Sequence, residues 1–206
     1  PSRGLILPGN FIPLFEKSEL IVKLDRYMFE HACRWYRIHL ERGGSPVSLA
    51  VNVSKAGLFQ NDFVDFYTDI KDKYSVPDGV LELEFTESMA ADTELFAELV
   101  VNLNARGFIC SLDDFGSGYS SLNLLKNLPI DVLKLDILFF HKSRDIRRER
   151  IVVSNVINMA RELNIKTIAE GVEDMDTVEF LRKAGCNVIQ GYVFAKPCLR
   201  RILNIC

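Results

Sequence analysis

From about residue 47 onward, short apolar runs alternate with longer amphipathic segments. Short apolar runs bounded by turn residues predict buried strands, whereas apolar positions spaced three or four apart predict helices. The strand pattern is present at 47–54, 80–88, 108–115, 131–140, 166–173 and 186–194. The helix pattern is present at 63–74, 93–106, 120–128, 149–164 and 175–184. The chain therefore predicts an α/β protein in which strands and helices alternate.

Turn and capping residues support these boundaries. Gly107 and Gly185 follow predicted helices, where a residue with left-handed backbone is expected. Asp92 and Asp174 precede predicted helices as N-caps. The apolar stripe of the helix predicted over 149–164 consists of Ile151, Val152, Val156, Met159, Ala160 and Leu163, with Asn155 as its one polar member.

The first 46 residues have a different pattern. Residues 3–15 contain two glycines and two prolines and predict a loop, and residues 16–40 predict a helix. On that helix Leu20, Leu24, Met28 and Ala32 lie four apart on one face. No strand pattern precedes the loop.

Strands that alternate with helices require right-handed crossovers and a parallel sheet buried on both faces. An open doubly wound sheet and a closed barrel both satisfy this requirement. Nearly every predicted strand here ends in a polar or charged residue, and an open sheet uses few strand ends because its ligand binds at one switch point. We therefore expect a modified TIM-like β/α barrel whose first strand is missing from this chain.

Composition narrows the class of protein. The 206 residues are 48% hydrophobic and fit one domain over 1–206, truncated at the N-terminus and possibly at the C-terminus. A net charge of −3 gives no reason to expect DNA as a partner. The chain has no membrane segment, and its five cysteines lack metal-ligand spacing, so we expect a cytoplasmic location unless missing domains anchor the parent in a membrane.

Asp113 and Asp114 are the most informative residues, because two adjacent carboxylates end an apolar strand and precede a glycine-rich turn. Buried carboxylates need cations or protons nearby, which makes a divalent metal ion the natural partner. The alternative is a capping turn ahead of the helix predicted from residue 120.

Two other strands carry similar residues. Glu82 and Glu84 share one face of their strand, as in a metal site or in a solvated antiparallel edge strand. Asn52 lies within an apolar strand, where a hydrogen-bonded core asparagine is the usual explanation and a carbonyl ligand to a hard cation is the functional one.

Lys134 is a charged residue inside an apolar strand, and Asp136 lies on the same strand face. A structural ion pair between them is one explanation, and a cation that orients a water or a phosphoryl oxygen is the other. Glu170 and Gln190 each end a strand and precede a glycine, which lets a ligand approach the backbone.

The balance of charge favours the metal site. Against Lys134, the strand ends carry a large excess of carboxylates: Glu84, Glu87, Asp113, Asp114, Asp136, Glu170 and Glu173. Oxygen ligands without a histidine or cysteine set select Mg²⁺ or Mn²⁺ over Zn²⁺. Two such ions about 4 Å apart clamp a phosphodiester and activate a water.

The ordered motifs resemble the EAL-domain family of cyclic di-GMP phosphodiesterases over almost the whole chain. They are Pro8-Gly9-Asn10-Phe11-Ile12-Pro13, Asn52-Val53-Ser54, Glu84-Phe85-Thr86-Glu87, the stretch from Asp113 to Ser121, Lys134-Leu135-Asp136, the stretch from Ala169 to Glu173, and Gln190-Gly191-Tyr192. The resemblance implies a bacterial second-messenger hydrolase that opens cyclic di-GMP to linear pGpG with two Mg²⁺ or Mn²⁺ ions.

The resemblance also implies residue roles. The metal ligands would be Asn52, Glu84, Asp113, Asp114 and Glu170. Lys134 would hold the attacking water and Glu170 would be the general base. Glu87, with Asp136, would support the loop after Asp114, which in the family couples dimer formation to metal binding. Gln190, Tyr192 and Glu173 would line the substrate pocket.

The chain departs from the family pattern at its start, because the Glu-Ala-Leu tripeptide that names the family is absent. The resemblance further implies a homodimer fused to sensory or cyclase domains in the full protein, and this truncated piece would bind metal poorly. A catalytically inactive cyclic di-GMP receptor is the alternative, and a different metal-dependent phosphodiesterase on the same barrel is a third reading.

Overall fold

The computed structural model describes residues 6–18, 20–91, 93–115, 122–136 and 145–196. The chain divides into two compact units, Pro1–Ser111 and Leu112–Cys206. The strands follow the sequence in the order β1-β2-β3-β4-β5-β6, and the division between the units falls within β3.

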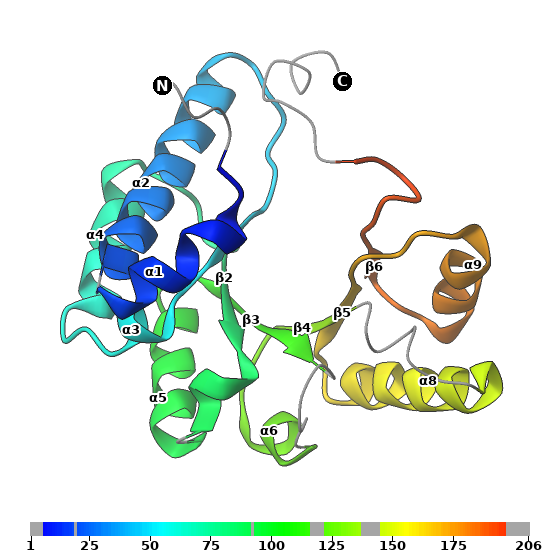
Figure 1. Ribbon diagram of the computed structural model, residues 1–206. Coiled ribbons are helices and arrows are strands. Elements are labelled where there is room, and N and C mark those ends of the chain that lie inside the picture. Colours follow the sequence, from blue (N-terminus) through cyan, green and yellow to red (C-terminus); the bar gives the residue numbers. More distant parts are fainter. Residues whose placement is uncertain (1–5, 19, 92, 116–121, 137–144, 197–206) are drawn as a thin grey trace. The chain divides into compact units, whose positions relative to one another are not determined.

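The first unit contains the long helix and the first strands (Figure 1). Its elements are η1 (Pro8–Asn10), α1 (Ile12–Lys17), α2 (Leu20–Glu41), β1 (Leu49–Asn52), α3 (Lys55–Leu58), α4 (Phe63–Lys73), β2 (Leu81–Thr86), η2 (Glu87–Ala91), α5 (Thr93–Asn104) and the start of β3 (Ile109–Phe115). The loop predicted over 3–15 is wrong for 12–15. Pro13 lies in the first turn of α1, where its missing N–H has no helical partner to lose.

The second unit contains the end of β3 and the remaining elements. These are α6 (Leu122–Asn127), β4 (Val132–Leu135), α8 (Ile146–Glu162), β5 (Lys166–Ala169), α9 (Met175–Ala184) and β6 (Val188–Ile189). All six predicted strands are present, and most are shorter than predicted. Strands β5 and β6 end several residues before the predicted strand ends, and residues 137–140 of the predicted fourth strand lie outside the described residues.

The strand pairs for which the register is defined are all parallel. Asn52 lies beside Glu84 in the β1–β2 pair, and Leu135 lies beside Ala169 in the β4–β5 pair. Because β2 lies between β1 and β3, the reading of its glutamates as part of an antiparallel edge strand is wrong. A parallel sheet with intervening helices is confirmed for the α/β fold class.

The predicted caps agree with the structure where they are described. The Asp174 side chain accepts a hydrogen bond from the Thr177 N–H at 2.8 Å. Gly107 and Gly185 have φ angles of 80° and 89°, as left-handed C-cap residues do. Asp92 lies outside the described residues.

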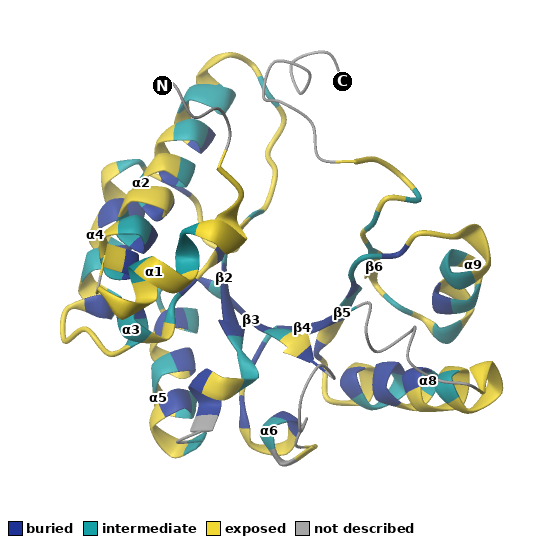
Figure 2. Ribbon diagram, viewed as in Figure 1, coloured by how far each residue is buried: buried dark blue, intermediate teal, exposed yellow. Residues whose placement is uncertain are grey.

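Helix α2 buries a different face from the one that the sequence pattern favoured, and α8 buries only part of its predicted stripe (Figure 2). On α2 the buried residues are Ile21, Asp25, Phe29, Cys33 and Tyr36. Ile21, Asp25, Phe29 and Cys33 each follow by one position a residue of the predicted face, on which Leu20 and Met28 are exposed. On α8 the buried residues are Val153, Val156, Ile157 and Ala160, whereas Ile151 and Val152 are exposed. Both helices carry apolar residues on more than one face, so the sequence alone did not fix their rotation.

The core of the first unit is rich in aromatic side chains. Tyr67 on α4 packs against Phe29 of α2, with ring centroids 4.3 Å apart, and against Phe63. Cys33 and Cys110 are buried free thiols. Among the described residues, no helix is both long and apolar enough to cross a bilayer.

Candidate functional site

The carboxyl ends of β4 and β5 bring Lys134 and Glu170 together. The two strands are parallel, with Lys134 beside Ile168, and the Glu170 N–H donates to the Leu135 carbonyl at 2.9 Å. Neighbouring parallel strands end at the same edge of a sheet, so side chains near their last residues meet there. The sequence prediction that these strand ends converge is confirmed for this pair.

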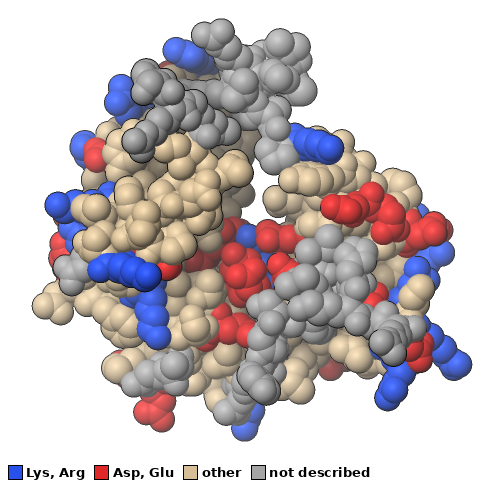
Figure 3. Space-filling model, viewed as in Figure 1, with Lys and Arg blue, Asp and Glu red and all other residues tan. Residues whose placement is uncertain are grey.

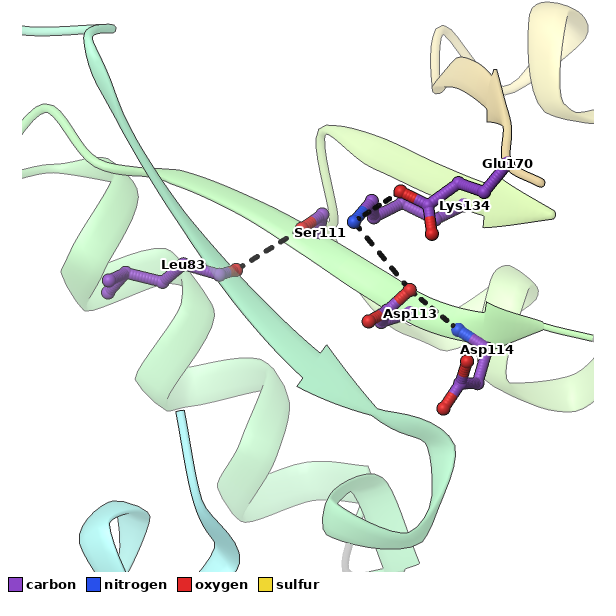
Figure 4. Close-up of polar contacts among 6 residues, drawn as sticks. All are labelled: Leu83, Ser111, Asp113, Asp114, Lys134 and Glu170. Carbon is purple, nitrogen blue, oxygen red and sulfur yellow. Dashed lines mark hydrogen bonds and ion pairs between the residues drawn. The ribbon is translucent and has the colours of Figure 1, made fainter. Parts of the chain in front are cut away.

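Lys134 is a buried lysine with two carboxylate partners from other strands (Figure 4). Its Nζ lies 2.7 Å from Glu170 Oε1 and 3.7 Å from Asp113 Oδ1. The Lys134 side chain is 8% exposed, against 15% for Asp113 and 27% for Glu170. A lysine buried to this degree stays charged only with such partners.

Asp113 and Asp114 are residues of β3 itself. Asp113 Oδ1 accepts a hydrogen bond from the backbone N–H of Asp114 at 2.9 Å. The alternative of a capping turn ahead of the next helix involves residues 116–121, which lie outside the described residues. Asp114 has a φ of 57°, which non-glycine residues adopt at a cost. This turn directs the two adjacent carboxylates differently, as Figure 4 shows.

The Asp114 carboxylate experiences an excess of negative charge. Burial raises its pKa, and the carboxylates of Asp113, Asp136 and Glu170 raise it further, while Lys134 lowers it only in part. Asp136 therefore belongs to the same electrostatic cluster. We call Asp113, Asp114, Lys134, Asp136 and Glu170 the acidic cluster.

In the first unit, Asn52 and Glu84 are partners at the carboxyl ends of β1 and β2. They lie side by side in the register, and the Val53 N–H donates to the Glu84 carbonyl at 3.1 Å. Glu84 is buried, whereas Asn52 is exposed. The reading of Asn52 as a core asparagine is therefore wrong, because the strand ends at this residue.

Two further glutamates lie on β2 or directly after it. Glu82 has a buried Oε1 atom without a hydrogen-bond partner among the described residues. Glu87 begins η2, directly after β2, and the loop that it was expected to support, 116–121, lies outside the described residues. On the next strand Ser111, which is buried, donates from Oγ to the Leu83 carbonyl at 3.4 Å (Figure 4).

The residues expected to bind substrate follow β5 and β6. The Gln190 N–H donates to the Ala169 carbonyl at 2.8 Å, and the Val172 N–H donates to the Gln190 carbonyl at 3.0 Å. Gly191 packs so closely on Val172 that a Cβ there would lie 2.7 Å from the Val172 carbonyl carbon. These contacts tie Gln190 to the loop that follows Glu170.

The side chains of this region are open to solvent. Gln190, Glu173 and Tyr192 are all exposed, and Lys196 Nζ lies 5.7 Å from the centre of the Tyr192 ring. Exposed carboxylates continue from Glu173 through Asp174 and Asp176 into the start of α9, where Figure 3 shows acidic side chains at the surface.

The donor set of the acidic cluster fits a hard divalent cation. Two of its four carboxylates, Asp113 and Glu170, contact the single ammonium group, and the other two belong to the cluster electrostatically, so its candidate ligand atoms are carboxylate oxygens. Within the part of the chain that the structure describes, no group of three or more histidine, cysteine, aspartate or glutamate side chains is already arranged around a cation position. Lys134 engages one oxygen each of Asp113 and Glu170.

Asp25 is a buried charged residue that the sequence pattern did not indicate as part of a site. The signal was present, since Asp25 is the one charged residue in a stripe of residues spaced four apart: Ile21, Asp25, Phe29 and Cys33. The structure buries that whole stripe, and Asp25 is only 8% exposed.

Comparisons with known proteins agree on one family. The family model described as "EAL domain" matches residues 1–197. The bifunctional diguanylate cyclase/cyclic di-GMP phosphodiesterase MucR of Pseudomonas aeruginosa is 38% identical over 96% of this chain and 29% of its own length. The cyclic di-GMP phosphodiesterase NbdA of the same organism is 36% identical over 96% of this chain and 25% of its own length.

A solved structure of the PaMucR phosphodiesterase in complex with c-di-GMP is also similar. It is 38% identical, with a TM-score of 0.90 over 98% of this chain and 83% of that one. This likeness confirms the α/β, TIM-like fold class predicted from the sequence. The chain spans about a quarter to a third of the curated relatives that it matches.

Proposed function

Because this chain belongs to the EAL domain family, we propose that it hydrolyses cyclic di-GMP to linear pGpG with Mg²⁺ or Mn²⁺. The observation that carries the proposal is the position of Lys134 between Glu170 and Asp113 at the carboxyl ends of strands. A buried ammonium beside carboxylates offers both a donor and acceptors to one water molecule.

The reaction adds water across one phosphodiester of the cyclic dinucleotide. The water oxygen bonds to phosphorus, the bond from phosphorus to the 3′ oxygen breaks, and that oxygen leaves as a hydroxyl. Lys134 donates a hydrogen bond that orients the water, and Glu170 accepts the water's proton. Since Lys134 Nζ and Glu170 Oε1 lie 2.7 Å apart, one water can contact both groups.

The metal ligands that we propose are Asn52, Glu84, Asp113, Asp114 and Glu170, the set that the family resemblance implies. Two bound ions would neutralise the phosphate charge and increase the acidity of the water. The excess of carboxylates in the acidic cluster supports this assignment, because Lys134 offsets only part of it.

The substrate contacts that we propose follow β5 and β6. Tyr192 offers an exposed aromatic face to a guanine base, with Lys196 near the same ring. The Glu173 carboxylate can accept from the N–H groups of a guanine edge, and the Gln190 amide can both donate and accept. Their exposure leaves them free to bind a ligand of this size.

We further propose that Glu87 and Asp136 support the loop after Asp114, that the full protein is a homodimer, and that other domains regulate it. The relatives named above are much longer than this chain, which supports the last point. Buried free thiols at Cys33 and Cys110 support a reducing, cytoplasmic location.

The test is turnover by the full-length natural protein. Cyclic di-GMP is incubated with the protein and MgCl₂ or MnCl₂, and pGpG is quantified by chromatography, with EDTA as the metal-free control. We expect pGpG only with metal, and a loss of about 10²-fold or more for Glu170→Gln, which removes the proton acceptor.

Two results would contradict the proposal in different ways. Calorimetric binding of cyclic di-GMP without any pGpG would identify a receptor that does not turn the ligand over. Neither binding nor hydrolysis would leave a different phosphodiester as the substrate.

A further inference from the structure

Asp25 is a carboxylate buried in an apolar face of α2. Its neighbours on that face are Ile21, Phe29 and Cys33, which are all buried. Burial raises the pKa of Asp25, and hydrogen bonds from Ser54 lower it in part. The Tyr67 hydroxyl, which interacts electrostatically with Asp25, is buried without a hydrogen-bond partner in the described residues. Burying a carboxylate in such surroundings costs free energy, which its hydrogen bonds must offset.

The Asp25 carboxylate contacts the turn that follows β1. Asp25 Oδ2 accepts a hydrogen bond from the Ser54 backbone N–H at 3.0 Å. Ser54 Oγ in turn accepts from the Gly57 N–H at 2.9 Å and caps α3. A Cβ on Gly57 would lie 2.6 Å from Asp25 Oδ2, so the carboxylate packs directly on this glycine. Asp25 therefore fixes both ends of the turn 54–57.

Asn52 lies two residues before this turn. The β1–β2 ladder fixes the backbone at the next residue through the Val53 N–H and the Glu84 carbonyl. One residue further along the chain, Asp25 holds Ser54. The exposed Asn52 side chain thus projects from a segment that is anchored at Val53 and at Ser54.

We propose that Asp25 is a positioning residue that sets the affinity of this protein for its divalent metal ion by fixing the orientation of Asn52. The inference rests on the proposed function only in taking Asn52 as a metal ligand. Asp25 itself touches neither metal nor substrate. Partners that orient metal ligands in this way change metal affinity by about 10- to 100-fold when they are removed.

The experiment measures Mn²⁺ binding to the substrate-free full-length protein by titration calorimetry. We expect Asp25→Asn to weaken Mn²⁺ binding by about 10-fold, and kcat to recover at saturating Mn²⁺. Asp62→Asn is the matched control, because it removes an equal charge from an exposed residue. Asp62 pairs with Arg26, which is the residue after Asp25 on α2. We expect this control to leave the Mn²⁺ affinity unchanged.

A double-mutant cycle separates positioning from general stability. In an Asn52→Ala background, adding Asp25→Asn should cause no further loss of Mn²⁺ affinity, because the orientation of a missing ligand cannot matter. An equal loss in both backgrounds, or a lower melting temperature in EDTA with unchanged Mn²⁺ affinity, would overturn the inference and leave Asp25 with a role only in the stability of the turn 54–57.

A second variant covers the case in which Asp25→Asn does not fold. Gly57→Ala keeps the carboxylate but crowds it with a Cβ, and we expect it to weaken Mn²⁺ binding in the same direction. Wild-type protein that binds Mn²⁺ without hydrolysing cyclic di-GMP would refute the proposed activity and leave this inference standing. Wild-type protein that does not bind Mn²⁺ would refute the inference.

Discussion

The Lys134 ammonium and the Glu170 carboxylate, from adjacent parallel strands, lie 2.7 Å apart and both are largely shielded from water. Lys134 also approaches Asp113, so one cation links two carboxylates. Replacing Lys134 with an uncharged residue removes the ion pairs of Asp113 and Glu170 and leaves both carboxylates in place as possible metal ligands. This relationship separates the role of Lys134 in turnover from any role in metal binding.

Lys134→Met is expected to reduce kcat by about 10²-fold or more, because the water loses its hydrogen-bond donor. Mn²⁺ binding to the substrate-free protein should not weaken, since Asp113 and Glu170 no longer engage an ammonium. Lys183→Met is the control, because Lys183 is exposed and pairs with Glu179 on the surface of α9. Weaker Mn²⁺ binding in Lys134→Met would show that the lysine organises the metal ligands.

Asp114→Ala and Asp114→Asn form a matched pair, because both remove one carboxylate from the acidic cluster. Asp114 has a φ of 57°, and asparagine tolerates this conformation better than alanine does. In EDTA, Asp114→Ala should unfold with a free energy about 1 kcal/mol lower than Asp114→Asn. Denaturant titration measures the difference, and equal stabilities would show that the turn relaxes.

Gly191→Ala is expected to raise the KM for cyclic di-GMP and to lower the melting temperature. Its Cβ would meet the Val172 backbone, which must move and shift Gln190 with it. Gly9→Ala is the control for stability, because a Cβ at Gly9 meets no atom within 4 Å and its φ is not positive. An unchanged KM in Gly191→Ala would show that Gln190 does not contact substrate.

The pH dependence of stability should differ between the wild type and Asp25→Asn. Because burial raises the folded-state pKa of Asp25, the native state binds more protons than the unfolded state in the window above the usual aspartate range. The contribution of Asp25 to the unfolding free energy of the wild type therefore rises as pH falls from neutral toward about 4. Asp25→Asn lacks this contribution.

The measurement for that prediction is the melting temperature of both proteins in EDTA between about pH 7 and pH 4. The difference between the two isolates Asp25, since the other titrating groups are common to both. A difference that stays constant with pH would show that Asp25 keeps its ordinary pKa in the folded protein.

The sequence by itself determined the order of the six strands and of the longer helices, and the polar residues that lie near the strand ends. Alternating apolar runs and amphipathic segments specify strands and helices because each buries its apolar residues with its own period. Asn52, Glu84, Asp113, Lys134 and Glu170 were all found from one feature, a polar residue at the end of an apolar strand.

Only the tertiary structure decided which helix faces are buried and which side chains pair. Apolar residues cover more than one face of α2 and α8, so their rotation depends on what they pack against. The partners of Lys134 come from β3 and β5, and Ser54 reaches Asp25 across 29 positions of the chain. Contacts between residues so distant in sequence depend on three-dimensional packing, which no local period encodes.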